Sequence, residues 1–160
     1  MHIPASVQSI GESAFRDCKN LEKVTFAKDS QLKEIGEYAF RYCSSLKHIS
    51  LPKNIEEIHK SCFYDSGLEE IVIPRNVKKI VENDYFDGVF SNCRNLRSVV
   101  FEQGSELTEI GERAFSERKS LLNICLPDKL KEIGERAFLS TGLTDVQIPA
   151  SVQNIGEYAF

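Results

Sequence analysis

One signature, Ile-x-x-x-x-Phe, recurs along the whole chain and constrains its fold more than any other feature. Six copies are uninterrupted and one carries an insertion. The copies are Ile10–Phe15, Ile35–Phe40, Ile58–Phe63, Ile80–Phe90, Ile110–Phe115, Ile133–Phe138 and Ile155–Phe160. A unit of about 23 residues is too short to bury its own apolar face, so neighbouring units must stack and share one core. The repeat therefore predicts a solenoid.

A second signature, Leu-x-x-Val/Ile-x-apolar, follows each of the first six copies. Its members are Leu21/Val24/Phe26, Leu46/Ile49/Leu51, Leu68/Ile71/Ile73, Leu96/Val99/Phe101, Leu121/Ile124/Leu126 and Leu143/Val146/Ile148. The last two apolar residues alternate with variable ones, which is the period of a β-strand. We therefore expect six strands. A second short extended segment should end at each signature Ile, and the Gly-Glu-x-Ala-Phe that follows predicts a helical turn, with its glycine at a tight turn.

The spacing of the repeats reveals a longer period. The Phe-to-Phe steps are 25, 23, 27, 25, 23 and 22 residues, and removing five extra residues between Ile80 and Phe90 leaves two similar sets of three. This pattern indicates duplication of a three-unit block. Residues 3–15 and 148–160 agree at eleven of thirteen positions. We expect residues 1–160 to form a single solenoid of about six repeats cut from a longer array, with uncapped ends that associate end to end.

Composition excludes several classes of partner. The chain is 41% hydrophobic and 28% charged, with a formal net charge of −4, so it lacks the basic stripe that nucleic acid requires. No apolar run approaches the roughly 18 residues of a membrane span, and we expect no membrane insertion. Five cysteines without Cys-x-x-Cys exclude a complete disulfide framework and a zinc site of the usual spacing. Cys18, Cys43 and Cys93 each follow a signature Phe by three residues; buried free thiols are expected, with a Cys18–Cys43 disulfide as the alternative.

Nothing in the pattern predicts catalysis. His2, His48 and His59 fall in three different phases of the repeat, and no Ser or Cys has a base placed beside it. A column of glutamates after the signature glycine imitates paired carboxylates but fits a solvated face. We therefore expect no enzyme, no cofactor and no metal site.

The composite pattern Leu-x-x-Ile-x-Ile-Pro-x-x-Val-x-x-Ile-Gly-x-x-Ala-Phe-x-x-Cys resembles the BspA-like class of leucine-rich repeats. The clearest unit runs from Leu68 to Ile80, and the resemblance covers almost the whole chain. It departs at 58–63, where His59 and Cys62 replace Gly and Ala, and at the insertion 81–89. The resemblance implies an α/β repeat, a right-handed solenoid with a parallel sheet on its concave face and short helical turns on the other side. It also implies a cell-surface or secreted adhesion protein that binds a protein, such as a host extracellular-matrix or surface protein.

Two columns of the expected sheet point away from the core and vary from unit to unit, as positions selected for a ligand do. The first is Lys23, His48, Glu70, Ser98, Asn123 and Asp145, and the second is Thr25, Ser50, Val72, Val100, Cys125 and Gln147. Val72, Val100 and Cys125 form an apolar stripe with a polar rim, which is typical of a small interface centre. Residues that merely favour an exposed strand would give the same stripe.

The insertion is the second candidate site. It places Asp84, Tyr85, Phe86 and Asp87 in one acidic, aromatic loop. A recognition loop, a cation site and a tolerated insertion remain alternatives. The chain as a whole is expected to be a non-enzymatic protein-binding or adhesion module. An intracellular scaffold or structural spacer, and a regulatory repeat region of a larger protein, are the alternatives that the residues leave open.

Overall fold

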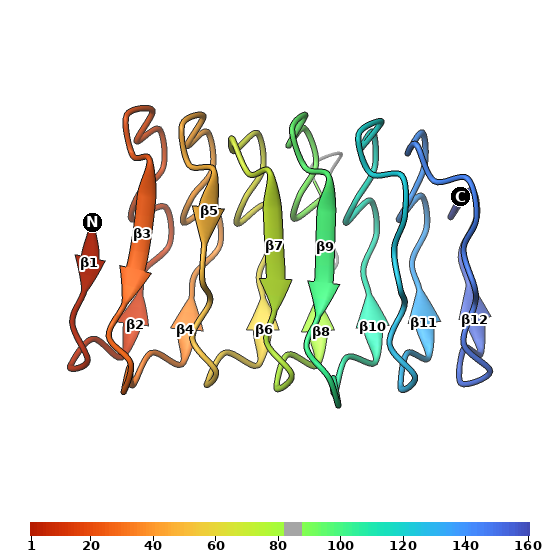
Figure 1. The fold of residues 1–160 in the computed structure, drawn as a ribbon, viewed down its shortest axis with the longest axis horizontal. Coiled ribbons are helices and arrows are strands. Elements are labelled where there is room, and N and C mark those ends of the chain that lie inside the picture. Colours follow the sequence, from red (N-terminus) through yellow and green to blue (C-terminus); the bar gives the residue numbers. More distant parts are fainter. Residues whose placement is uncertain (82–87) are drawn as a thin grey trace.

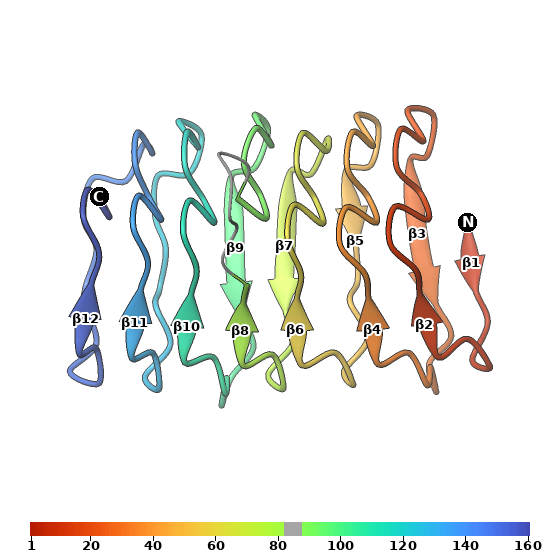
Figure 2. The ribbon, with the colours of Figure 1, turned by 180° about the vertical axis from the view of Figure 1, so that it is seen from behind.

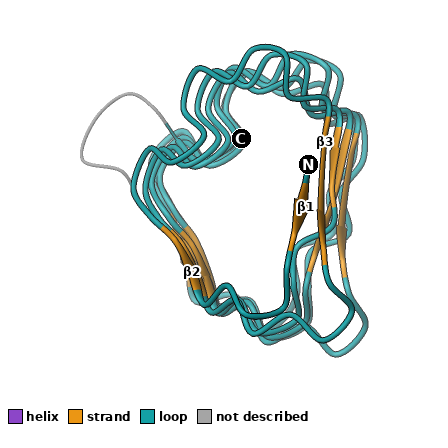
Figure 3. Ribbon diagram, turned by 90° about the vertical axis from the view of Figure 1, so that its left-hand side faces the viewer, coloured by secondary structure: helices purple, strands orange, loops and turns teal. Residues whose placement is uncertain are grey.

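The computed structural model describes residues 1–81 and 88–160, which form one row of stacked coils (Figure 1). The coils have three sides: two carry the strands, and the third is formed by turn segments (Figure 3). The long-strand face carries β1 (His2–Ile3), β3 (Lys23–Phe26), β5 (His48–Ile49), β7 (Glu70–Ile73) and β9 (Ser98–Phe101). The short-strand face, in front in Figure 2, carries β2 (Ser9–Ile10), β4 (Glu34–Ile35), β6 (Glu57–Ile58), β8 (Lys79–Ile80), β10 (Glu109–Ile110), β11 (Glu132–Ile133) and β12 (Asn154–Ile155).

All pairing between strands is parallel, as a solenoid requires. The long-strand face contains the sheets β1-β3-β5 and β7-β9, and the short-strand face contains β2-β4 and β6-β8-β10-β11-β12. Every short strand ends at a signature Ile, which confirms the second extended segment predicted from the sequence. The solenoid prediction is also confirmed, because each strand pairs with its counterpart in the adjacent coil.

Two of the six predicted long strands are absent from the described part of the chain. Residues 123–126 and 145–148 are assigned to no strand, although they run next to β9 and to each other (Figure 1). Strand length follows the outward residue at the second-column position. The four-residue strands have Thr25, Val72 or Val100 there, whereas the short or missing strands have Ser50, Cys125 or Gln147. Because β-branched side chains favour the strand conformation, this difference gives a physical reason for the interruption.

The described residues of the turn segments contain no helix, so the predicted helical turns, and with them the α/β class, are wrong. The residue after Gly-Glu has a positive φ throughout the described copies, for example 58° at Tyr38 and 54° at Arg136, and a second positive φ follows the Phe by two residues. Left-handed residues at these points prevent an α-helix from continuing. Alternate N–H groups instead bond to the next coil, as from Phe15 to the Ala39 carbonyl at 2.9 Å and from Phe40 to the Cys62 carbonyl at 2.9 Å.

The core is a column of stacked side chains between the three sides. The seven signature phenylalanines form a continuous stack, with successive ring centroids 5.1–5.6 Å apart and ring planes within 11° of parallel. The signature isoleucines from Ile10 to Ile133 are buried beside them. This shared core confirms that neighbouring units bury each other's apolar faces.

Each signature glycine begins a tight turn, as predicted; the Gly36 carbonyl, for example, accepts the Ala39 N–H at 3.3 Å. Gly36 and Gly134 also lie against the backbone of the preceding coil. A Cβ on Gly36 would lie 2.7 Å from the Glu12 nitrogen, and one on Gly134 would lie 2.7 Å from the Glu112 nitrogen. Among the described residues, the only glycine with a positive φ is Gly104, which lies outside this column. The Gly36 N–H donates to the Ile10 carbonyl at 2.8 Å, between two coils whose strands β2 and β4 are paired. In the next coil His59 replaces the glycine, and β6 of that coil is not paired with β4.

Candidate functional site

The long-strand face holds the two predicted outward columns. Ten of their twelve residues are exposed, and Thr25 and Ser98 are partly exposed. Their inward neighbours, such as Ile71 and Val99, are buried. The alternation of inward and outward side chains is therefore as predicted, while the binding role of the columns stays a prediction. The other candidate residues, Asp84, Tyr85, Phe86 and Asp87, lie outside the described residues.

The centre of this face is apolar. Val72 in β7 and Val100 in β9 are register partners on adjacent strands, and their side chains are 46% and 49% exposed. Cys125, the next member of the column, is also exposed. Two valines side by side on a solvated sheet form the kind of small apolar patch around which protein interfaces are built.

A further exposed apolar residue, Leu122, was not predicted from the sequence. It is 53% exposed and directly precedes the outward residue Asn123. A signal for it exists in the repeat, because the equivalent positions of the four preceding units hold charged residues: Glu22, Lys47, Glu69 and Arg97. A leucine at an otherwise charged, exposed position marks a place where the surface differs from the rest of the array.

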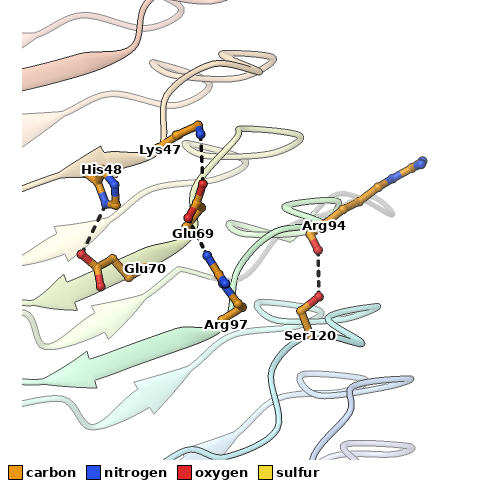
Figure 4. Close-up of polar contacts among 7 residues, drawn as sticks. All are labelled: Lys47, His48, Glu69, Glu70, Arg94, Arg97 and Ser120. Atoms are coloured by element: carbon orange, nitrogen blue, oxygen red, sulfur yellow. Dashed lines mark hydrogen bonds and ion pairs between the residues drawn. The ribbon is translucent and has the colours of Figure 1, made fainter.

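A charged network borders the apolar centre across three successive strands (Figure 4). The Lys47 Nζ lies 3.3 Å from Glu69 Oε1, and an Arg97 terminal nitrogen lies 2.6 Å from Glu69 Oε2. The hydrogen bond from Lys47, followed by the interactions with Arg97, holds the pKa of the Glu69 carboxyl below its usual value. Because Glu69 pairs with two cations, these three side chains are held in place at the rim of the face and together carry one net positive charge.

A second polar contact joins β5 to β7, the strand that carries Val72. His48 Nδ1 is 3.3 Å from Glu70 Oε1, and both residues belong to the first outward column (Figure 4). They line a recess of about 290 Å³ between β5 and β7, which Ser50, Val72, Pro74 and Glu102 also line. The recess opens where β5 ends after Ile49, so the interruption of this strand shapes the surface beside the apolar patch.

The cysteines are free thiols and most are inaccessible. Cys43, Cys62 and Cys93 are buried, Cys18 is partly buried and Cys125 is exposed. Burial raises the pKa of Cys43 to about 12 and also raises the pKa of Cys62 and Cys93, which makes all three poor nucleophiles at neutral pH. Within residues 1–81 and 88–160, no three His, Cys, Asp or Glu side chains gather in a way that could hold a metal ion.

The described chain also contains no helix of the length and apolarity that a membrane crossing needs. The long-strand face combines an apolar centre, a charged rim and a recess. Its backbone is held on one side by the β7–β9 ladder and below by the buried core. Such an arrangement presents side chains to a partner on a rigid support.

Comparison with solved structures shows where the same fold occurs. A leucine rich cell surface protein from Faecalibacterium prausnitzii A2-165 is 30% identical, with a TM-score of 0.73 over 98% of this chain and 38% of that protein. The T. pallidum leucine rich repeat protein TpLRR is 28% identical, with a TM-score of 0.83 over 98% of this chain and 72% of that one. The pneumococcal vaccine antigen PcpA is 26% identical, with a TM-score of 0.56 over 94% of this chain and 30% of that one.

This chain thus spans well under half the length of two of these three relatives. No curated protein sequence matches it. The family described as BspA type leucine rich repeat region matches residues 1–88 and 83–160, with six copies of the repeat. Since that match includes every residue of the chain, the protein belongs to the BspA-type leucine-rich repeat family.

Proposed function

We propose that the long-strand face binds a protein partner, and that the chain acts as an adhesion module of a cell-surface or secreted protein. The observation that carries this proposal is the contrast between core and face. The core repeats the same Phe, Ile and Leu columns from coil to coil, whereas the residue types in the outward columns vary along the array. Packing requires the first pattern, and ligand selection accounts for the second.

The chemistry of the face suits a protein ligand. An exposed apolar centre at Val72 and Val100 supplies surface whose burial stabilises a complex. The flanking Glu69 ion pairs and the Glu70–His48 contact supply polar groups that fix orientation without requiring long side chains to be ordered on binding. An ion-paired rim around an apolar centre is the arrangement expected of a protein interface.

The relatives support a surface location. The Faecalibacterium protein is described as a leucine rich cell surface protein, and the pneumococcal protein is described as a vaccine antigen. Both descriptions apply to those proteins. Carried to this chain, they favour an extracellular setting, in which a host extracellular-matrix or surface protein is the partner class to screen first.

A binding screen with paired variants tests the proposal. Immobilised extracellular-matrix and surface proteins are probed with the wild-type chain, with a Val72→Ser/Val100→Ser variant and with a Glu34→Gln/Glu57→Gln variant of the short-strand face. The proposal expects one or more partners to bind the wild type and the short-strand variant but not the long-strand variant. Binding that survives the valine changes and is lost with the glutamate changes would move the site to the other face.

We also propose that the 160-residue chain associates end to end. Along the turn segments, N–H groups of one coil donate to carbonyls of the next, as from Arg136 to Glu157 and from Phe138 to Ala159. The next donors in this series are the N–H groups of Tyr158 and Phe160. At the other end, the Glu12 and Ala14 carbonyls are the equivalent acceptors.

The aromatic stack supports the same geometry. Phe160 is 49% exposed and stacks on Phe138 at 5.2 Å, which leaves its other ring face to receive Phe15 of a second copy. Light scattering over a range of concentrations measures the association. The expected mass rises with concentration, and Phe160→Asp should return it to that of a monomer. A monomer at every concentration contradicts the proposal.

A further inference from the structure

Cys18 and Cys43 occupy the same repeat position in adjacent coils. Each follows a stacked phenylalanine by three residues, and the rings of Phe15 and Phe40 are 5.2 Å apart. Beside the cysteines the Asp17 N–H donates to the Arg41 carbonyl at 2.9 Å. The two coils therefore have about the 4.8 Å spacing of hydrogen-bonded strands, which is within the Cα–Cα range of about 4.4–6.8 Å that a disulfide spans. Sequence position alone does not show where the thiols point, but for Cys43 a hydrogen bond of its thiol does.

The Cys43 thiol already reaches across to the first coil. Its Sγ donates to the Phe15 carbonyl oxygen at 3.0 Å, and the same oxygen accepts the backbone N–H of Cys18 at 3.2 Å. The two cysteines thus share one acceptor. Among the described residues, the Cys18 side chain makes no hydrogen bond, and it is only partly buried. Rotation of Cys18 about its χ1 angle is therefore enough to direct its Sγ toward Cys43.

The same position further along the array shows that side chains there touch. Ser66 and Cys93 are the equivalent pair two coils later, and the Ser66 Oγ lies 3.3 Å from the Cys93 Sγ. Cys93 also donates to the carbonyl of Phe63 in the preceding coil, at 2.9 Å, as Cys43 does to Phe15. The pair Cys18 and Cys43 differs in having sulfur on both sides.

We propose that Cys18 and Cys43 are a disulfide-forming pair that links the first two coils when the protein meets a small-molecule disulfide. In the first step the Cys18 thiolate attacks the oxidant R–S–S–R, forms Cys18–S–S–R and releases one R–S⁻. In the second step the Cys43 thiolate attacks the Cys18 Sγ and expels the second R–S⁻. The protein thiols lose two protons and two electrons, and the oxidant is reduced to two thiols.

The two steps have different rates. Burial raises the pKa of Cys43 to about 12, so the second step is slow at neutral pH and quickens as the pH rises. Once formed, the bond closes the loop between residues 18 and 43 and restricts the unfolded chain. The inference is independent of partner binding, because neither cysteine belongs to the long-strand face.

Incubation of the folded chain with oxidised glutathione, followed by acid quenching and peptide mass mapping, tests the proposal. The wild type should yield a linked peptide pair containing Cys18 and Cys43, and its thermal midpoint should rise by several degrees. Cys43→Ser should stop at a glutathione adduct on Cys18 and show no such rise. Exposed Cys125 should carry glutathione in both proteins and so serve as an internal control.

Two results would overturn the proposal. One is a wild-type protein that retains glutathione on Cys18 as Cys43→Ser does, at alkaline as well as neutral pH. The other is a Cys18–Cys43 link that forms only when urea is present, since the native coil geometry would then not promote it. A Cys18→Ser variant in which Cys43 stays reduced would support the order of the two steps.

Discussion

Val72 and Val100 are register partners in β7 and β9, and each keeps nearly half of its side-chain surface exposed. The same two residues lengthen their strands to four residues, because a β-branched side chain favours the strand conformation. One pair of valines therefore has two separable effects, one on the sheet and one on the exposed surface. Variants can distinguish them.

Val100→Glu places a charge in the centre of the long-strand face. Because the side chain points to solvent, the free energy of unfolding should change by no more than about 0.5 kcal/mol. Partner affinity should fall at least about tenfold, since burying an unpaired carboxylate opposes binding. Calorimetric binding and urea unfolding measure the two quantities. Unchanged affinity would remove the valine pair from the interface.

The double variant Val72→Thr/Val100→Thr serves as the control for strand formation. Threonine keeps the β-branch but replaces a methyl group with a hydroxyl. Backbone amides of β7 and β9 should therefore keep their slow hydrogen exchange, while affinity falls. If affinity is retained along with the strands, the valines contribute to the interface through backbone shape alone.

Gly36→Ala tests the close approach of coils on the short-strand face. The new Cβ would lie 2.7 Å from the Glu12 nitrogen and 2.9 Å from the Gly11 carbonyl carbon, so the coils must separate. We expect a loss of about 1–3 kcal/mol in the free energy of unfolding. Gly11→Ala is the matched control, because its Cβ meets nothing within 4 Å. It should be neutral or stabilising by up to about 1 kcal/mol. Equal losses in both variants would contradict the packing explanation.

Ser140→Gly distinguishes the observed turn from a helix by the sign of its effect. Ser140 has a φ of 57° and is exposed. Glycine adopts this conformation without the strain that a Cβ causes, so stability should rise by about 0.5–1 kcal/mol. In a helical turn the same change would lower stability by about 0.5 kcal/mol, because glycine is a poorer helix former than serine. Urea unfolding gives the answer, and a clear loss would mean that the left-handed conformation is not maintained in solution.

Arg118 is a buried cation at the position where other units have Cys, Ser or Thr. It is 1% exposed, one terminal nitrogen has no hydrogen-bond partner among the described residues, and burial lowers the pKa of its guanidinium. Arg118→Met keeps much of the volume and removes the buried charge, so unfolding free energy should rise by about 1 kcal/mol. Arg118→Ala should lower it, because a cavity results. A strongly destabilising Arg118→Met would reveal a compensating interaction.

The sequence allowed the core and the facing of the strands to be predicted, because both depend on residue periodicity. The helical turns predicted for the turn segments were wrong. Gly-Glu-x-Ala-Phe contains good helix formers, but alternate N–H groups of the turn donate to the next coil, as Phe15 does to the Ala39 carbonyl, and only the N–H groups between them donate within their own segment. Local propensity cannot reveal a hydrogen bond between units 24 residues apart. The absence of strands at 123–126 and 145–148 could not be predicted either, because it follows from the outward residues, which the apolar pattern does not include.

The candidate site was predictable in part. Alternation along each strand placed Val72 and Val100 on the outside, and the structure agrees. Leu122 was not predicted, because it lies outside the two outward columns, at the position that directly precedes the first of them. The Lys47–Glu69–Arg97 network could not be predicted, since it requires knowing which side chains lean toward the adjacent strands.

Side-chain oxidation footprinting of the chain with a captured partner tests the central claim most directly. Hydroxyl radicals label exposed side chains, and a bound partner protects those that it covers. Binding through the long-strand face predicts reduced labelling of Val72, Val100 and Leu122, with Ile155 and Tyr158 unchanged in complexes of a single copy. Protection confined to the short-strand face or the turn segments, with the two valines labelled as in the free chain, would contradict it.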